Sequence, residues 1–444
     1  MNAVNEEPTG LRHIFRALRY KNYRLYFTGQ SLSLIGTWMQ RIAVGWLVYR
    51  MTNSPFLLGL VGFAAQFPTF ITAPFAGTLS DRWNRLSIIK VTQWLAMAQA
   101  AVLAVLVLTH TVTVTHVIVL SVVLAVVNGF DMPVRQALTV DLVDRKKDLG
   151  NAIALNSSMF NAARLIGPSV AGILIAATGE GVCFVVNALS YVPIIIALQK
   201  MDVPPQRPPE ERKHVLRDLK DGVGYAFGFA PIRFIILLLA LISMVSMPNQ
   251  VLMPIFARDV LRGGPHTLGF LVGAMGVGAL VGAYYMAARK SVHGLGNMIP
   301  IASAVFGGAT IVFALSPIAW LSFPFVAVAG FGLIIHMASS NTVIQTVVDD
   351  DKRGRVMSFY TMSFMGVAPL GSLIAGSLAG RIGAPHTLVI CGSVAILGAL
   401  LFARKLPEMG RVVLPIYARK GIVPEAVLDV QDGTQFNVSG SDRP

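Results

Sequence analysis

The stretches LSIIKVTQWLAMAQAAVLAVLVL (residues 86–108) and VTHVIVLSVVLAVVNGFDMPV (residues 114–134) are joined by the short polar turn THTVT. Each stretch is long enough to cross a bilayer as a helix, which needs roughly 20 mostly apolar residues. Similar stretches recur along the chain, and together they place helices at residues 23–49, 56–79, 86–108, 114–134, 151–177, 182–199, 232–256, 268–288, 298–315, 320–340, 356–379 and 385–403. The pattern predicts an all-α integral membrane protein with twelve transmembrane helices.

The composition agrees with a membrane protein. Of the 444 residues, 54% are hydrophobic and only 13% are charged, whereas charged residues make up about 25% of a soluble domain. The net charge of +14 would indicate nucleic-acid binding in a soluble protein. Here the positions of the charges exclude that function, because the basic residues lie in the tails and alternate loops as they do in membrane proteins.

Most Lys and Arg residues lie in the two tails and in alternate loops on one side of the predicted helices. On the other side we find Arg50, Arg258, Arg262 and Arg381. Basic residues are enriched on the cytoplasmic side of membrane proteins. The sequence therefore predicts a multi-pass protein of the cell inner membrane with both termini in the cytoplasm.

A long internal loop divides the chain into two halves. It contains PPQRPPEERKH at residues 204–214, whose prolines and charges cannot form a packed core. The halves also share features, since residues 128–172 and 341–376 each run from a helix end through a charged loop into a proline-containing helix. The predicted organisation comprises an N-terminal tail, a six-helix bundle, a linker, a second six-helix bundle and a C-terminal tail, at residues 1–22, 23–199, 200–231, 232–403 and 404–444.

The sequence lacks motifs for chemistry. We find no phosphate-binding loop, no nucleophile elbow and no His-Glu helix motif. The two cysteines and eight histidines have no spacing suited to a metal. We therefore expect no enzyme activity, no metal and no cofactor, and an energy source in an ion or solute gradient.

Several motifs resemble the major facilitator superfamily. GTLSDRWNR at residues 77–85 is similar to its loop motif between helices 2 and 3. The stretches at residues 128–138, 151–172 and 353–360 resemble the branch that contains the bacterial enterobactin exporter and macrolide efflux proteins. The resemblance implies two pseudo-symmetric six-helix bundles around a central cavity, alternating access, and export of an amphipathic compound.

The loop motif consists of Gly77, Asp81, Arg82 and Arg85. Asp81 could accept hydrogen bonds from the N-terminus of a neighbouring helix, while the arginines supply opposite charge. The resemblance assigns this contact to a latch that closes the cytoplasmic side in the outward-facing state. Asn84 replaces a common glycine, and asparagine tolerates left-handed geometry. The alternative is a solvated anchoring loop.

Gly167, Pro168 and Gly172 on the fifth helix resemble the antiporter signature of exporters. Small residues on one face allow another helix to approach closely, and proline removes a backbone hydrogen bond. The match is partial, because Ala163 or Arg164 stands where the signature has a further glycine. The alternative is a purely structural kink.

Arg41 and Arg164 lie at membrane depth, where a charge costs roughly 2.5–3.5 kcal/mol. Arg41 shares a polar stripe with Ser33, Thr37 and Gln40, which we expect to face the bundle interior. Gln40, Arg41 and Arg164 are therefore candidates for contact with an anionic or polar solute. Alternatively, the arginines hold backbone carbonyls inside the protein.

Asp131 and Arg135 are four residues apart near the cytoplasmic end of the fourth helix, and Asn128 lies one turn earlier. This spacing allows an ion pair. Asp131 is a candidate for proton coupling or gating together with Arg135, and Asn128 is a candidate for the substrate cavity. The alternative is an ion pair that shapes the helix end, and the usual arginine-bearing antiport motif of this helix is absent.

The seventh and tenth helices carry further polar residues. Asn249 and Gln250 lie between Pro248 and Pro254, where a broken helix would free carbonyl groups, and His336 interrupts the tenth helix. We expect Asn249, Gln250 and His336 to line the cavity. A packed, non-titrating role is the alternative for His336.

These patterns predict a secondary active transporter, and the family resemblance implies that it exports a drug or siderophore by alternating access, coupled to inward proton flow. Its expected partners are the small-molecule substrate, protons and the lipid bilayer, and we expect a monomer. An uptake permease or a lysophospholipid-type translocator of the same fold is one alternative. A membrane scaffold or enzyme without transport is an alternative of another class.

Overall fold

The computed structural model describes residues 15–80, 83–143, 145–203, 224, 227–289, 291–350 and 352–422. Every regular element in these ranges is helical. The first half contains η1 (Arg16–Arg19), α2 (Lys21–Thr52), α3 (Pro55–Ala64), α4 (Phe67–Ser80), α5 (Arg85–Leu108), α6 (Val114–Asp141), α7 (Lys146–Thr178) and α8 (Glu180–Lys200). The second contains α10 (Ala230–Val251), α11 (Met253–Ile255), η2 (Phe256–Val260), α12 (Pro265–Ala288), α13 (Leu295–Leu315), α14 (Ala319–Val347), α15 (Arg353–Ile382) and α16 (Ala384–Arg419).

All twelve predicted spans are present as helices, so the predicted fold class is confirmed. The second span is divided into α3 and α4, and the seventh into α10, α11 and the π-helix η2. Among the described residues, 11 helices are long and apolar enough to cross a membrane. The span that is not among them is α2, which carries Gln40 and Arg41.

The turns between helices repeat from one half to the other. Gly179 joins α7 to α8 and Gly383 joins α15 to α16, each with φ of 85°. Asn53 before α3 and Arg262 before α12 also have positive φ, at 49° and 50°. Glycine adopts positive φ freely and asparagine tolerates it, whereas Arg262 adopts it at a steric cost. The repeated turns support the pseudo-symmetry expected from the sequence.

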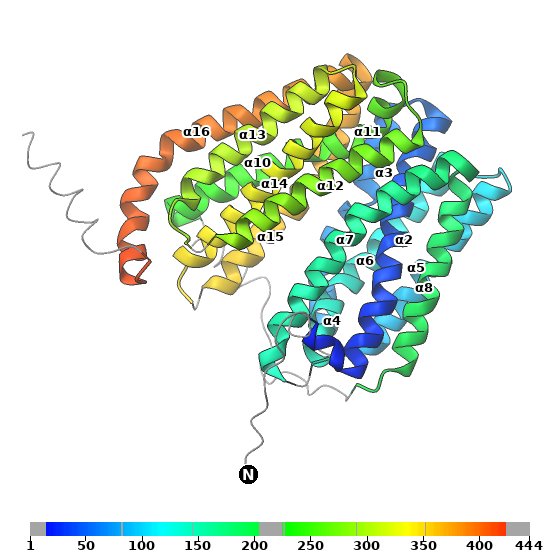
Figure 1. Cartoon of the computed structure of the whole chain (residues 1–444), viewed down its shortest axis with the longest axis horizontal. Coiled ribbons are helices and arrows are strands. Elements are labelled where there is room, and N and C mark those ends of the chain that lie inside the picture. The colour runs from blue at the N-terminus through cyan, green and yellow to red at the C-terminus, as the bar shows by residue number, and fades with distance from the viewer. Residues whose placement is uncertain are drawn as a thin grey trace, which may run out of the picture.

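The two six-helix bundles meet at one end and diverge towards the other (Figure 1). We call the side with η1 and the α6–α7 turn the terminal side, and the side with Asn53, Gly179 and Gly383 the opposite side. Most bundle-to-bundle contacts join α3 to α15 and α7 to α12. Their contact points lie near the opposite side, at the N-terminal end of α3 and the C-terminal end of α7.

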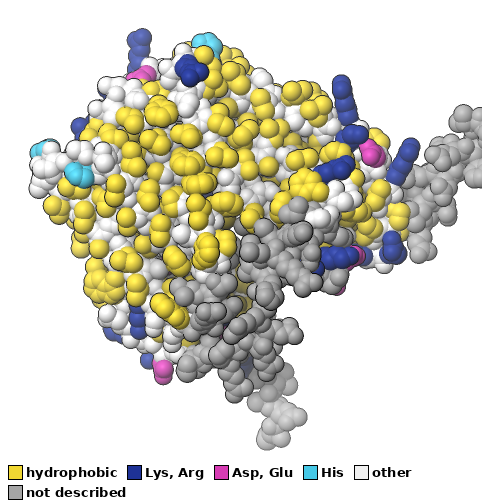
Figure 2. Space-filling view, turned by 180° about the vertical axis from the view of Figure 1, so that it is seen from behind, with side chains coloured by type: hydrophobic (Ala, Val, Ile, Leu, Met, Phe, Trp, Pro, Cys, Tyr) yellow, Lys and Arg dark blue, Asp and Glu magenta, His cyan; other side chains and the backbone are white. Residues whose placement is uncertain are grey.

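The outer surface is mostly apolar, and basic side chains lie along its rim (Figure 2). Large exposed side chains include Val105, Leu189 and Ile301, each about 60% exposed. A lipid-facing surface must be apolar because the hydrocarbon core offers no hydrogen-bond partners. The surface therefore fits a bilayer that surrounds both bundles.

Several helices continue past the predicted membrane boundary. Hydropathy predicts that the last span ends at residue 403, but α16 extends to Arg419 and changes direction along its length (Figure 1). Pro407 lies inside it, and proline is a common cause of helix bends. The extension packs Met409 and Tyr417 inward, while Lys420 Nζ donates a hydrogen bond to the Thr346 carbonyl (2.7 Å). Hydropathy locates the membrane segment but not the end of the helix.

Candidate functional site

Two reciprocal glycine contacts join the bundles near the opposite side. A Cβ on Gly59 of α3 would lie 2.7 Å from the Cα of Gly376 on α15. Likewise, a Cβ on Gly172 of α7 would lie 2.9 Å from the Cα of Gly269 on α12. Helices in membranes pack this closely only where both residues are small. The backbones themselves therefore seal the opposite side in this state.

A polar contact reinforces this seal. The Tyr49 hydroxyl, at the end of α2, donates a hydrogen bond to the Asp259 carboxylate of η2. Next to it, Arg258 Nη1 donates to Asn53 Oδ1 at 2.8 Å. These contacts were not predicted from the sequence. The signal available was the pair of charged residues, Arg258 and Asp259, that follows Pro254 at the end of the seventh span. π-helical turns often occur at functional sites.

We expect Tyr49→Phe to weaken the closure of the opposite side. A hydrogen bond to a charged group contributes about 1.5–3 kcal/mol, so opening should become roughly tenfold or more favourable. The readout is the reaction of an impermeant thiol reagent with Ser372→Cys, because Ser372 is fully buried at the Gly59 contact. The background would lack Cys183 and Cys391.

Tyr284→Phe is the matched control for this measurement, because Tyr284 is 77% exposed and lies near the other end of α12. It should leave the labelling rate unchanged. Equal labelling rates in Tyr49→Phe and the parent would show that the hydroxyl contact does not hold the opposite side closed.

Arg41 faces the space between the bundles. Gly45 lies one turn away on the same face of α2. A Cβ added to Gly45 would lie 3.6 Å from the Pro254 ring, so this face of α2 is directed towards the other bundle. The Arg41 guanidinium lies over the Trp38 ring, 4.5 Å from its centroid, and the side chain is exposed. Arg41 thus lies just on the terminal side of the seal.

Arg164 approaches the same space from α7. Pro168, one turn along, is at the contact with Gly269, and the neighbouring Leu165 packs against Gly276 of α12. Arg164 is half-buried, and its charge repels that of Arg41. The structure therefore brings together two of the predicted cavity residues, Arg41 from α2 and Arg164 from α7 of the N-terminal bundle.

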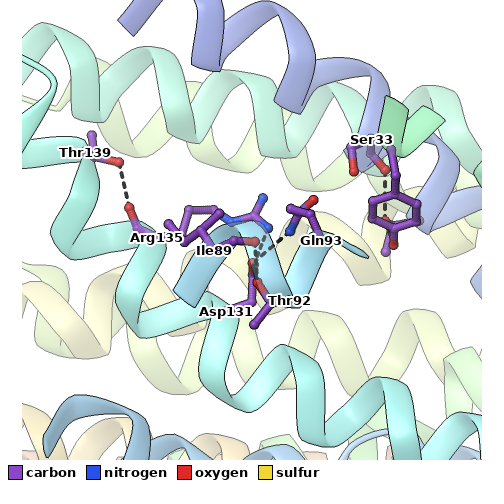
Figure 3. A network of polar contacts seen from close by, with 9 residues as sticks. Ser33, Ile89, Thr92, Gln93, Asp131, Arg135 and Thr139 are labelled. Carbon is purple, nitrogen blue, oxygen red and sulfur yellow. Dashed lines mark hydrogen bonds and ion pairs between the residues drawn. The ribbon is translucent and has the colours of Figure 1, made fainter. Parts of the chain in front are cut away.

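Asp131 and Arg135 form a buried ion pair inside the N-terminal bundle (Figure 3). The Asp131 carboxylate also accepts hydrogen bonds from Thr92 Oγ1 and Gln93 Nε2 of α5, both at 2.8 Å. Three donors thus converge on one carboxylate. The pair is present as the spacing predicted, but it links α5 to α6 rather than facing the other bundle.

Three other candidates are held within their own bundles. Gln40 donates to Gln99 (2.9 Å) and accepts from Asn187 (2.7 Å), so both ends of its amide are occupied. In the C-terminal bundle, Asn249 donates to Thr310 (3.3 Å), and His336 Nδ1 contacts Ser303 (2.8 Å). Their contact with solute stays a prediction, which this geometry does not favour.

Asn128 and Gln250 are the remaining cavity candidates. Both are half-buried, and the described chain gives neither of them a hydrogen bond from its side chain. Asn128 precedes Gly129, where α6 packs on Thr72 of α4, and Gln250 follows Asn249 in α10. That Asn128 and Gln250 line the substrate cavity stays a prediction.

The loop motif is only partly described. Gly77 lies in the last turn of α4, Asp81 and Arg82 lie outside the described residues, and Arg85 Nη1 pairs with Asp141 at 3.0 Å. The left-handed geometry that asparagine tolerates is not used at Asn84, whose φ is −61°. Its side chain instead accepts a hydrogen bond from the Ser87 amide (3.2 Å) and caps α5.

The helix 5 motif provides close packing on two sides. A Cβ on Gly167 would lie 2.6 Å from the Trp38 Cβ of α2, within the bundle. Gly172 and the carbonyl of Pro168 face Gly269 of the other bundle. The motif therefore serves both the internal packing of the bundle and the seal between bundles. Among the described residues there is no group of three metal-ligating side chains.

Two membrane-embedded bundles that seal against each other on one side and carry arginines between them define a helical transporter of the alternating-access type. The sequence supports this class independently: residues 13–428 match the family described as transmembrane secretion effector. The chain belongs to this family of the major facilitator superfamily, and the predicted family is confirmed.

Similar proteins include transporters with stated substrates. The staphyloferrin A transporter of Staphylococcus aureus is 24% identical over 382 residues, covering 85% of this chain and 95% of that protein. Macrolide efflux protein A of Streptococcus pyogenes is 22% identical over 393 residues, covering 86% and 96%.

Solved structures share the fold. One is a bacterial homologue of the human lysosomal transporter Spinster in an inward-facing and unoccupied conformation. It has a TM-score of 0.66 and 15% sequence identity, and the match covers 88% of this chain and 98% of that one.

Proposed function

We propose that this protein exports an amphipathic small molecule, such as a drug or a siderophore, across a bacterial inner membrane by alternating access. The names of its relatives support this class of substrate. The observation that carries the proposal is the seal at Gly59–Gly376 and Gly172–Gly269, with Arg41 and Arg164 on its terminal side. A solute would reach the arginines from the terminal side.

The direction of transport depends on which side is cytoplasmic. The excess of Lys and Arg in the tails and terminal-side loops supports a cytoplasmic terminal side. With that orientation, the state described here faces inward, and a cytoplasmic solute loads between the bundles. In this orientation both termini lie in the cytoplasm. The proposal also treats the protein as a monomer.

Proton exchange is the energy source in this proposal. The Asp131 carboxylate is buried inside α6 (Val114–Asp141), which supports it as the coupling group. Coupling would require Asp131 to separate from Arg135 and take up a proton in another state, because here its carboxylate is engaged by Arg135, Thr92 and Gln93.

The test uses purified protein in proteoliposomes. Accumulation of a panel of amphipathic drugs and siderophores would be followed with and without an imposed pH gradient. Export predicts uptake into inverted vesicles that increases when the interior is acidic. Transport that ignores the gradient would remove proton coupling. Transport only of lysophospholipids, or only in the inward direction, would replace export with one of the other functions of this fold.

A further inference from the structure

Within the described chain, the two arginines between the bundles have no acidic counterpart. The carboxylates in its membrane-spanning helices each contact another group: Asp131 with Arg135, Asp141 with Arg85, Asp148 with Arg16 and Arg19, Glu180 with Arg50, Asp259 with Tyr49, and Glu408 with Lys405. No described hydrogen bond joins Arg41 or Arg164 to a backbone carbonyl, so the alternative of internal anchoring has no support from the contacts in this state.

Two like charges at this depth are unfavourable on their own. Each arginine costs roughly 2.5–3.5 kcal/mol at a helix centre, and repulsion between the two adds to that cost. An anion placed between them would offset the repulsion between the two guanidinium groups. A guanidinium binds carboxylate and phosphate groups with two parallel hydrogen bonds, which makes arginine well suited to such a ligand.

An aromatic surface lies beside these charges. Trp38 lies under the Arg41 guanidinium and packs edge-on against Phe160, with ring centroids 5.8 Å apart. Phe160 is on the same helix as Arg164, one turn away, and is 40% exposed. A ligand held by both arginines would therefore have apolar surface within reach of its remaining atoms.

We propose that Arg41 and Arg164 form a binding site for the acidic group of an amphipathic anion, with Trp38 and Phe160 contacting its apolar part. The inference rests on the proposed export function and specifies its substrate class, namely anionic compounds with an aromatic or other apolar body. Gln40 contributes nothing to this site, because Gln99 and Asn187 occupy its amide.

The test compares three probes that share one ring system: 1-naphthoate, neutral 1-naphthamide and cationic 1-naphthylmethylammonium. Equilibrium binding to the full chain in nanodiscs of neutral lipid would be measured up to millimolar concentration. We expect 1-naphthoate to bind at least tenfold more tightly than either of the others, and increased salt to weaken it. Equal binding of the three probes, or no binding of 1-naphthoate, would overturn the inference.

Variants assign the effect to the two arginines. Arg41→Gln and Arg164→Gln should each lower the affinity for 1-naphthoate at least tenfold and leave that for 1-naphthamide unchanged. Arg41→Lys should retain part of the anion preference. Arg381→Gln, at the opposite-side end of α15, is the matched control. Unchanged 1-naphthoate affinity in both glutamine variants would also overturn the inference.

Nanodiscs that contain phosphatidylglycerol separate a solute site from a lipid headgroup site. Competition between this lipid and 1-naphthoate would assign the arginines to phospholipid and contradict the solute site. The outcome is separable from export itself: transport of a neutral drug by the unmodified protein in proteoliposomes would preserve the proposed function even if the anion site were wrong.

Discussion

Replacing Gly376 with alanine is expected to shift the protein from the state described here towards one that is open on the opposite side. The added Cβ would lie 2.6 Å from the Pro55 carbonyl oxygen and 2.7 Å from the Gly59 Cα. Both are backbone atoms, which cannot rotate away as a side chain could. Overpacking typically costs about 1–3 kcal/mol, which corresponds to a population shift of roughly 5- to 150-fold. Gly269→Ala should act similarly at the other contact, where the Cβ would lie 2.6 Å from the Pro168 oxygen.

The shift can be measured as a distance on the terminal side. Gly150 and Gly354 lie near the starts of α7 and α15, and a Cβ added to either would have no other atom within 4 Å. Spin labels on cysteines at these positions, in a background without Cys183 and Cys391, should report a shorter distance in Gly376→Ala.

Gly380→Ala is the matched control, because that glycine is one turn along α15 and faces open space. A distance distribution unchanged in Gly376→Ala would contradict a role for the glycine contact in the seal.

The sequence predicted the helices well but not their partners. Apolar stretches of the right length locate the spans, because lipid imposes the same requirement on each of them. The small residues of the helix 5 motif predicted close helix packing, and Gly172 does pack closely on Gly269. Gly59 and Gly376 carry no comparable sequence signal, because the partner of a glycine is set by how two distant helices cross.

The same limit explains the results for the candidate site. A polar residue in an apolar stretch must avoid lipid, but it can do so inside its bundle or between bundles. Gln40 and Arg41 are adjacent on α2, so they point in directions roughly 100° apart. The structure places Gln40 against α5 and α8 and Arg41 towards the other bundle. His336 gave the same polar signal as Arg41, yet it is completely buried against Ser303.

Asp131→Asn is expected to destabilise the folded protein strongly. The substitution removes the charge opposite Arg135 and leaves a buried guanidinium without compensation, which costs about 3–5 kcal/mol. The hydrogen bonds from Thr92 and Gln93 to a carboxylate are lost as well. We expect a large fall in the midpoint of thermal unfolding, measured by fluorescence-detected chromatography after heating, and a low yield of monodisperse protein.

The double variant Asp131→Asn, Arg135→Gln separates structure from proton coupling. Because both charges are removed, no uncompensated charge remains, and most of the lost stability should return. If Asp131 carries the proton, the recovered double variant should still bind and exchange solute but should no longer accumulate it against a gradient. Gradient-driven accumulation that survives in a stable double variant would show that Asp131 only links α5 to α6. In that case the coupling group would have to lie elsewhere, and the buried pair would account for the packing of the N-terminal bundle alone.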